Sequence, residues 1–163
     1  MLGLRELNVP RSRLFGSAPE ALASAMRACV ALEADASPGD VMLSVLGIPP
    51  DHMIVPWDQA SIAGLAVSRA IDEPARRRLA ARLAPLWPPG PHALAAAAVK
   101  AVAAVSEVSR HVVSCFVAPD DANLRRARTV ALPARLARSG VVAAEVPPLT
   151  NHDRVALDNA MLL

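Results

Sequence analysis

The sequence predicts an α+β fold in which antiparallel strands pack against long helices. The segments follow the order helix, two or three strands, two helices, three strands, helix. Strands that follow one another directly are joined as hairpins, whereas a doubly wound parallel sheet alternates strands with helices. Aromatic residues make up only 2% of the chain and Tyr is absent, so the core is built from Ala, Val and Leu. Long helices are the natural way to pack many such small side chains.

The length of 163 residues fits one domain, which we expect over residues 17–163, after a lead-in segment at residues 1–16. Hydrophobic residues are 53% and charged residues 20% of the chain, which excludes a disordered protein. The mean hydropathy of +0.33 is high for a small domain, because such a domain exposes much of its surface. This excess predicts an apolar face that another domain or subunit covers.

The first helix is predicted from a capping box, with Ser17 as the N-cap and Glu20 at the third helical position. A proline in the first turn supports this start. The helix is expected to reach about Ala34. Apolar residues recur at helical spacing and predict one buried stripe, formed by Leu22, Met26, Cys29 and Val30.

Short strands are predicted after this helix. Residues 41–46 form a buried strand by length and content, and a stiff loop with two prolines follows at residues 47–51. A return strand is expected at residues 53–57, where Pro56 places it at a sheet edge or near its own end. Residues 61–67 predict another short strand.

Two helices are predicted in the middle of the chain. Asp72 caps a helix that runs to about Leu86, and Pro91 opens an Ala-rich helix that ends near Ser109. The arginines of the first of these helices predict a solvated face, and the alternative is a basic face for an anionic partner. They are Arg76, Arg77, Arg78 and Arg82.

The last part of the chain predicts a strand at residues 112–117 and a turn at residues 119–123. Residues 127–136 and 141–146 pair as a hairpin across a short turn that contains Gly140. A second capping box, from Thr150 to Asp153, opens the final helix.

Several functions are not expected. The 17 Lys and Arg residues barely exceed the 15 Asp and Glu residues, and stacking aromatics are few, which argues against nucleic-acid binding. No Gly-rich phosphate loop is present, and the four His residues do not cluster as metal ligands.

No signal peptide or membrane-length apolar run is found, so we expect a cytoplasmic protein without a membrane partner. Cys29 and Cys115 are expected to be buried free thiols.

Asp51 and His52 form an adjacent pair of a carboxylate and an imidazole in the sequence. One interpretation is an exposed loop His. The other is a general base that is oriented by the carboxylate, because an Asp beside a His can fix the imidazole and raise its basicity.

From Val9 to its end the chain resembles the C-terminal, substrate-binding half of the NAD-dependent lactate/malate dehydrogenases. The match covers nearly the whole chain and includes a late hairpin and the start of the last helix. The matching residues are Val9, Pro10, Arg13, Gly16, Ala18, Arg27, Ala31, Pro38, Asp40, Val41, Val45, Leu46, Gly47, Asp51, Met53, Pro56, Trp57, Pro133, Leu136, Gly140, Val141, Leu149, Thr150 and Asp153.

The resemblance implies the same fold, but it places other residues at the positions of the family's catalytic groups. In the family a His takes the hydroxyl proton, an Asp orients that His, and an Arg grips the substrate carboxylate. The ungapped register puts Leu22 at the Asp position, Ala25 at the Arg position and Pro49 at the His position. His52 lies three residues after Pro49 and is a weak replacement, because it would still lack the Asp and the Arg.

The resemblance also implies that the NAD-binding Rossmann half of the family lies outside this chain. We therefore expect no cofactor on this chain alone, and NAD only where a separate Rossmann domain is supplied. Arg27 matches an arginine that helps to bind an anionic effector in some members, and the alternative is an exposed helical Arg.

Three functions remain after this comparison. The first is a catalytically inactive (pseudoenzyme) module that dimerises or binds a partner. The second is the substrate-binding half of a split or truncated 2-hydroxy-acid oxidoreductase that acts with an NAD-binding Rossmann polypeptide. The third is binding of a membrane surface or an unrelated partner through the apolar face and the arginine-rich helix.

Overall fold

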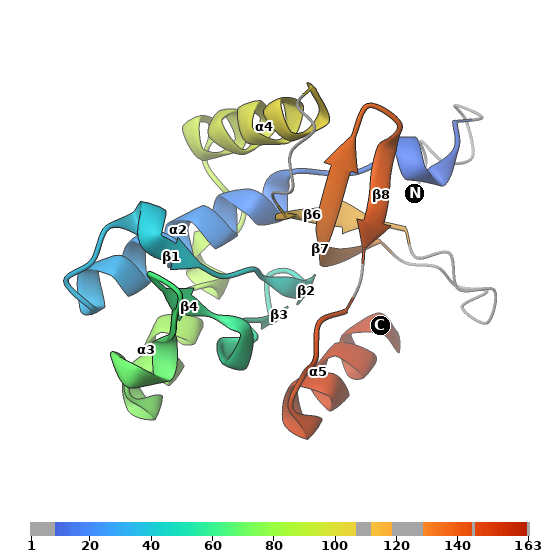
Figure 1. Cartoon of the computed structure of the whole chain (residues 1–163). Helices are drawn as coiled ribbons and strands as arrows, with labels where there is room; N and C mark the ends of the chain where they lie inside the picture. The colour runs from blue at the N-terminus through green and yellow to red at the C-terminus, as the bar shows by residue number, and fades with distance from the viewer. Residues whose placement is uncertain (1–8, 107–111, 119–128, 145, 163) are drawn as a thin grey trace.

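The computed structural model describes residues 9–106, 112–118, 129–144 and 146–162, and it confirms the predicted α+β class (Figure 1). Its described strands form a five-stranded and a three-stranded sheet, both antiparallel. The large sheet has the order β3-β2-β7-β6, with β8 paired to β7. Its strands are β2 (Leu46–Ile48), β3 (His52–Ile54), β6 (Val112–Val117), β7 (Val130–Ala137) and β8 (Gly140–Ala144). The small sheet contains β1 (Val41–Met42), β4 (Ser61–Ile62) and β5 (Leu65–Ala66).

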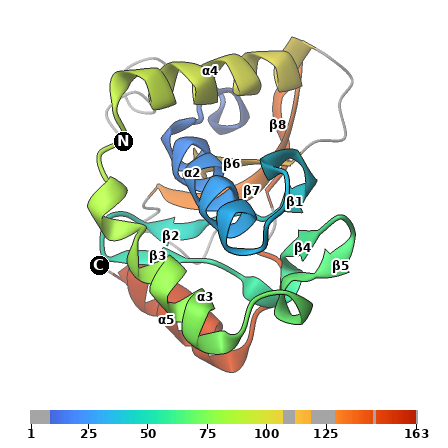
Figure 2. The ribbon, with the colours of Figure 1, turned by 90° about the vertical axis from the view of Figure 1, so that its left-hand side faces the viewer.

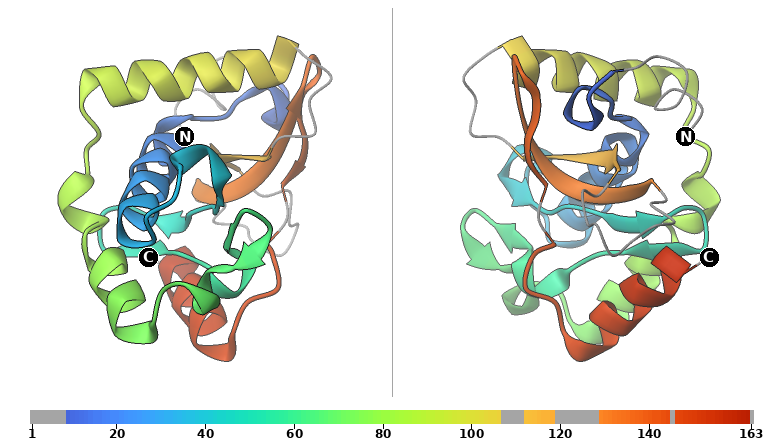
Figure 3. Two further views of the ribbon diagram at one scale, coloured as in Figure 1. Left: turned by 60° about the vertical axis from the view of Figure 1, so that its left-hand side comes forward. Right: turned by 90° about the vertical axis from the view of Figure 1, so that its right-hand side faces the viewer.

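Long helices pack at both ends of the large sheet. Helices α2 (Ala18–Glu33) and α4 (Pro91–Ser106) contact β6 and β7, and α5 (Asn151–Leu162) contacts β2 and β3. Helix α3 (Glu73–Ala81) lies at the same end of the molecule as α5, while α4 crosses the opposite end (Figures 2 and 3). Short 3-10 turns connect these elements: η1 (Arg11–Arg13), η2 (Pro38–Asp40), η3 (Trp57–Gln59), η4 (Val67–Arg69) and η5 (Ala84–Leu86).

The core has two apolar clusters. One surrounds α2, and the other fills the space between the large sheet, α4 and α5. The predicted stripe of α2 is confirmed for Leu22, Met26 and Val30, which are at most 1% exposed, whereas Cys29 is only half-buried. Each fully buried apolar side chain of this size contributes about 1.5–3 kcal/mol, so the stripe anchors α2 to the fold.

The start of α2 is as predicted, but its capping box is wrong. Ser17 has φ −88° and ψ −3° and makes no side-chain capping hydrogen bond. Glu20, the other half of the expected box, is fully buried and turns its carboxylate away from the helix start. Stronger charged partners elsewhere in the fold compete successfully for this carboxylate, as described below.

The strand predicted at residues 41–46 is divided between the two sheets. Residues 41–42 pair with β4 in the small sheet, and residues 46–48 pair with β3 and β7 in the large sheet. At the crossover the backbone N–H of Val45 donates to the Ser114 hydroxyl rather than to a strand, at 3.1 Å. Local apolar content therefore predicted burial correctly for Val41, Leu43, Val45 and Leu46. It was wrong for Met42, which is 60% exposed, and it missed the change of sheet.

The loop predicted at residues 47–51 is shorter than expected, because its first two residues belong to β2. The turn follows at residues 49–51 and contains a cis Pro49–Pro50 peptide bond. Gly47 has φ +99°, and a Cβ at this position would lie 2.0 Å from the His52 carbonyl oxygen. Only a glycine allows β2 and β3 to approach so closely here.

The neighbouring strand predictions need small corrections. The return strand is residues 52–54 and ends before Pro56, which is the N-cap residue of η3 and does not continue the strand. The strand predicted at residues 61–67 is a hairpin of β4 and β5 around Ala63 and Gly64, both of which have positive φ.

The later helices and the hairpin agree with the sequence except in their lengths. Asp72 caps α3 by accepting from the Ala75 N–H at 2.8 Å, but α3 ends at Ala81 and not near residue 86. Helix α4 begins at Pro91 as predicted, and Thr150 caps α5 through the Asp153 N–H at 3.1 Å. The β6 strand and the β7–β8 hairpin are confirmed. The predicted end of the Ala-rich helix near residue 109 and the turn at residues 119–123 lie outside the described residues.

The described part of the lead-in segment is joined to the domain. Gly16 exchanges two backbone hydrogen bonds with Phe116 in β6, at 3.0 and 2.8 Å, and η1 contacts β8. Among the described residues, no helix has both the length and the hydropathy needed to cross a membrane.

Candidate functional site

The three positions matched to catalytic residues of the family carry no group that transfers protons or binds carboxylates. Leu22 lies on α2 at 1% exposure, inside the apolar cluster around that helix. Ala25 follows one turn later, and Pro49 lies half-buried in the turn between β2 and β3. The Leu22 side chain is part of the core, so its position contributes to stability.

Asp51 and His52 do not form an oriented pair in the structure. Both residues are exposed, and His52 is the first residue of β3, opposite Ile48. No hydrogen bond joins the two side chains within the described residues. The arrangement that a general base needs is therefore not present here.

Arg27 is not an exposed helical arginine. Its side chain is only 13% exposed and forms an ion pair with Glu20, with 2.6 Å between Nη1 and Oε1. Its Nε and Nη2 both donate to the Leu43 carbonyl oxygen, at 3.2 and 3.0 Å. An anion that approached this guanidinium would have to compete with partners that are already in place.

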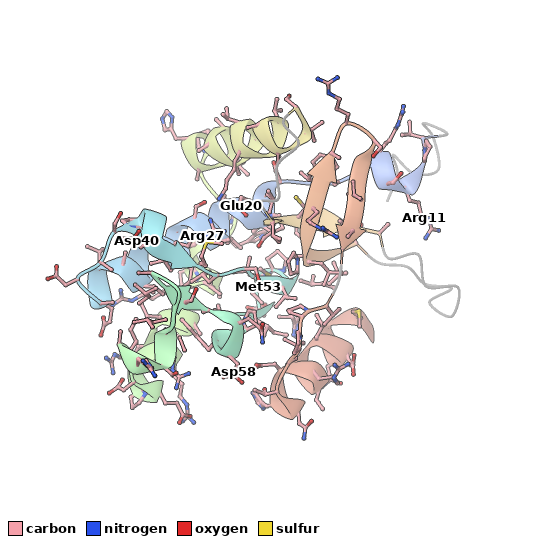
Figure 4. All side chains as sticks on the ribbon, viewed as in Figure 1. Arg11, Glu20, Arg27, Asp40, Met53 and Asp58 are labelled. Carbon is pink, nitrogen blue, oxygen red and sulfur yellow. The ribbon has the colours of Figure 1, made fainter. Side chains whose placement is uncertain are left out.

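Glu20 is the centre of a charge cluster, which we call the Glu20 cluster and which comprises Glu20, Arg27, Lys100 and Ser114. Figure 4 shows Glu20 and Arg27 of this cluster. Glu20 is 0% exposed. Its Oε1 accepts from Arg27 and from the Lys100 Nζ, each at 2.6 Å, and its Oε2 accepts from the Ser114 N–H at 2.8 Å. These contacts join α2 to α4 and to β6.

The electrostatics of the Glu20 cluster keep the carboxylate ionised. Burial raises the pKa of Glu20, but the hydrogen bond and charge of Arg27 and the hydrogen bonds from Lys100 and Ser114 outweigh it and hold the pKa below its usual value. Burial, with the Glu20 charge nearby, raises the pKa of the neighbouring Cys115 to about 12. Both cysteines are free thiols, but only Cys115 is buried.

The Glu20 cluster was not predicted from the sequence, because the local pattern assigns Glu20 to the helix cap. A local signal was present, since Glu20, Ser24 and Arg27 follow one another at spacings of four and three residues and so share a helix face. The partners on α4 and β6 are 80 and 94 residues away, and no local pattern identifies them.

A cavity of about 870 Å³ lies between β3, η3, α3 and α5. Met53 and Asp58 line this cavity, and both are labelled in Figure 4. Arg76, from the arginine-rich helix, also lines it. Arg77, Arg78 and Arg82 are exposed as predicted, whereas Arg76 is half-buried.

The outer surface of α4 is apolar and exposed, and we call it the α4 face. Its larger residues are Leu94, Val99 and Val102, with exposures of 38%, 69% and 64%. Alanines complete it at positions 93, 95, 96, 98 and 103. Lys100, on the same helix, directs its ammonium to Glu20. This exposed surface agrees with the apolar face that the high mean hydropathy of the sequence predicts.

The chain is similar to malate and lactate dehydrogenases of known sequence or structure. No protein-family model matches the chain. A malate dehydrogenase from Hydrogenobaculum sp. (strain Y04AAS1) is 26% identical over 160 residues, which cover 91% of this chain and 48% of that enzyme, in its C-terminal part.

Solved structures show the same relationship. The malate dehydrogenases from Aeropyrum pernix and Salinibacter ruber have TM-scores of 0.85 and 0.87 at 17% and 20% identity. The matches cover 97% and 98% of this chain but 56% and 55% of those chains. A lactate dehydrogenase from a Medee basin deep-sea metagenome library has a TM-score of 0.87 at 16% identity. The chain thus spans about half the length of these relatives, which confirms the resemblance for that half.

Proposed function

We propose that this chain, which has the fold of the C-terminal part of malate and lactate dehydrogenases, is a catalytically inactive module that associates with a second copy of itself. The observation that carries the proposal is which residues stand at the three positions that match the family's catalytic Asp, Arg and His. Leu22, Ala25 and Pro49 stand there, and Leu22 is a core residue at 1% exposure.

The chemistry that the resemblance implies needs groups that these residues lack. Oxidation of a 2-hydroxy acid requires a base for the hydroxyl proton and a cation for the carboxylate, in addition to a bound nicotinamide. Leu22 accepts no hydrogen bond, Ala25 binds no carboxylate, and Pro49 relays no proton. We therefore expect the purified chain to oxidise NADH with oxaloacetate or pyruvate no faster than buffer does. Saturable turnover would overturn the proposal.

The α4 face is the surface through which we expect self-association. Lys100 is 44% exposed but pairs its ammonium with Glu20, and the other exposed side chains between Leu94 and Ala103 are apolar. A second α4 face, related by two-fold symmetry, offers an equally apolar partner. The alanines permit close approach of two helices, and the valines supply apolar area.

Light scattering after size-exclusion chromatography tests this interface. We expect a dimer for the wild-type chain and a monomer for Val102→Glu, because the new carboxylate would be desolvated in the interface. Val142→Glu is the matched control, since Val142 is also exposed, at 59%, but lies on β8. A wild-type monomer at every concentration, or a dimer that persists in Val102→Glu, contradicts the interface.

The second candidate function is the substrate-binding half of a split or truncated NAD-dependent 2-hydroxy-acid oxidoreductase. The observation that favours it is coverage, because this chain spans about half of the relatives that it matches. In that case an NAD-binding Rossmann polypeptide would cover the α4 face and supply the cofactor. Native mass spectrometry of the polypeptide isolated from its source separates the two functions. A homodimer supports the first, and a complex with an NAD-binding chain supports the second.

Two smaller expectations accompany the proposal. The free thiols of Cys29 and Cys115 support a reducing, cytoplasmic location. An anion at Arg27 would require displacement of Glu20 from the guanidinium, so anion binding there should be weak.

A further inference from the structure

We infer that a second cavity, which lies between η1, the start of α2, α4 and the turn of the β7–β8 hairpin, binds an amphipathic anion. Such a ligand has an anionic head group, which Arg13 and Arg138 hold, and an apolar chain, which the wall of the cavity receives. Nothing in the fold relationship assigns a ligand to this cavity. The inference does not depend on the proposed function, because both arginines lie outside the α4 face.

The size and the walls of this cavity suit a small molecule with an apolar chain. Its volume of about 550 Å³ lies within the range of ligand pockets, which are mostly apolar and carry a few polar groups. The apolar lining comes from the segment before α2 and from one side of α4. It consists of Phe15, Ala98, Ala101, Val102 and Val105. A chain that packs against these side chains is removed from water, which favours binding.

The two arginines of this cavity come from separate elements that the backbone holds together. Gly140, the first residue of β8, packs against η1, since a Cβ at this position would lie 2.1 Å from the Ser12 carbonyl oxygen and 3.1 Å from the Arg13 Cα. Arg138 lies two residues before Gly140, in the hairpin turn, and lines the same cavity as Arg13. The close contact between β8 and η1 (Figure 1) therefore brings two arginines from distant parts of the chain to one cavity.

The charge of this cavity favours an anion. Arg13 and Arg138 are exposed, and neither forms an ion pair within the described part of the chain. The described residues that line the cavity include no Asp or Glu. Ser17 lines it as the N-cap residue of α2, so the positive end of that helix dipole lies beside it. An anionic head group relieves the repulsion between the two arginines, and each guanidinium offers a fork of donors that matches a carboxylate.

Isothermal titration calorimetry with octanoate tests the site. We expect saturable one-to-one binding, and much weaker binding of octanamide, which lacks the charge, and of inorganic phosphate, which lacks the chain. Arg13→Gln and Arg138→Gln should each weaken octanoate binding about five- to twentyfold, because one charge-assisted contact is lost. Arg135→Gln is the matched control and should bind as the wild type does, since Arg135 is an exposed arginine of the same hairpin that does not line the cavity.

Two neighbouring positions on α4 separate this site from self-association. Ala98 and Val99 are both exposed on the α4 face, but only Ala98 lines the cavity. A Glu at either position puts a carboxylate into the α4 face and should disrupt the proposed dimer to a similar extent. Only Ala98→Glu should abolish octanoate binding, because its carboxylate repels the ligand inside the cavity. Val99→Glu should bind octanoate whether or not the wild-type chain is a dimer.

Folding and self-association of these variants are measured apart from binding, by circular dichroism and by light scattering after size-exclusion chromatography. No saturable binding of octanoate to Val99→Glu, undiminished binding to the double variant Arg13→Gln/Arg138→Gln, or equal binding of octanamide would each overturn the inference. Adsorption to vesicles of anionic phospholipid without one-to-one binding of octanoate would also overturn it, because the surface would then serve a membrane.

Discussion

Removal of the Glu20 carboxylate is expected to destabilise the fold far more than removal of an exposed acidic residue. In Glu20→Ala, Arg27 keeps a side chain that is only 13% exposed but loses its ion-pair partner. The Ser114 N–H loses its acceptor as well. Breaking one side of a buried ion pair costs about 3–5 kcal/mol of unfolding free energy, because the remaining charge stays buried and unpaired.

The isosteric change Glu20→Gln should cost less, about 1–3 kcal/mol. A Gln keeps the volume and one acceptor oxygen, but it lacks the charge that matches Arg27 and Lys100. The double variant Glu20→Ala/Arg27→Ala should be more stable than the sum of the single changes predicts, since it leaves no unpaired Arg27.

The pH dependence gives an independent test of the same cluster. The pKa of Glu20 is held below its usual value, so its ionisation stabilises the fold at neutral pH, and this contribution is lost as the pH falls through the lowered pKa. In Glu20→Gln the contribution is absent at every pH. The stability difference between wild type and Glu20→Gln should therefore be largest near neutral pH and shrink as the pH falls through the lowered pKa of Glu20.

Urea denaturation of these variants, followed by circular dichroism from neutral to acidic pH, measures both effects. Glu33→Gln is the control, since Glu33 is 40% exposed and makes a 3.5 Å ion pair with Arg78. Such surface pairs contribute about 0–1 kcal/mol. The reasoning fails if Glu20→Ala costs no more than this control, or if the difference between wild type and Glu20→Gln does not change with pH.

Three further outcomes follow from the packing. Gly47→Ala should lower the unfolding free energy by about 2–4 kcal/mol, because its Cβ would meet a carbonyl oxygen of the facing strand at 2.0 Å. Gly64→Ala, with no atom within 4 Å of its Cβ, should cost clearly less in the same urea titration. A thiol reagent should modify the half-buried Cys29 first, because Cys115 is buried with its pKa raised to about 12. Leu22→Asp should lower the thermal midpoint sharply, since it buries an unpaired carboxylate, and even with Ala25→Arg and Pro49→His it should give no NADH oxidation without a Rossmann domain.

The sequence alone determined most of the elements, because their signals are local. Asp72 and Thr150 accept N–H groups three residues ahead, and that geometry depends only on the residues at the helix start. The β7–β8 hairpin follows from two apolar segments around a turn with Gly140, and the buried stripe of α2 follows from helical spacing. The family resemblance likewise depended on residue spacing along the chain, and the fold comparison confirmed it.

Only the tertiary structure decided where the polar groups lie. Glu20 satisfied the pattern of a capping box, yet in the fold a lysine 80 residues away and an N–H group 94 residues away reach its carboxylate. A charge-assisted contact inside the protein is stronger than a neutral contact at an exposed helix start, so the buried cluster prevails. Arg76 shows the opposite case, since the packing of α3 and α5 encloses its Nε without providing an acceptor. Both outcomes depend on which residues, far apart in the sequence, come close together in the folded chain. Local sequence patterns do not specify those contacts.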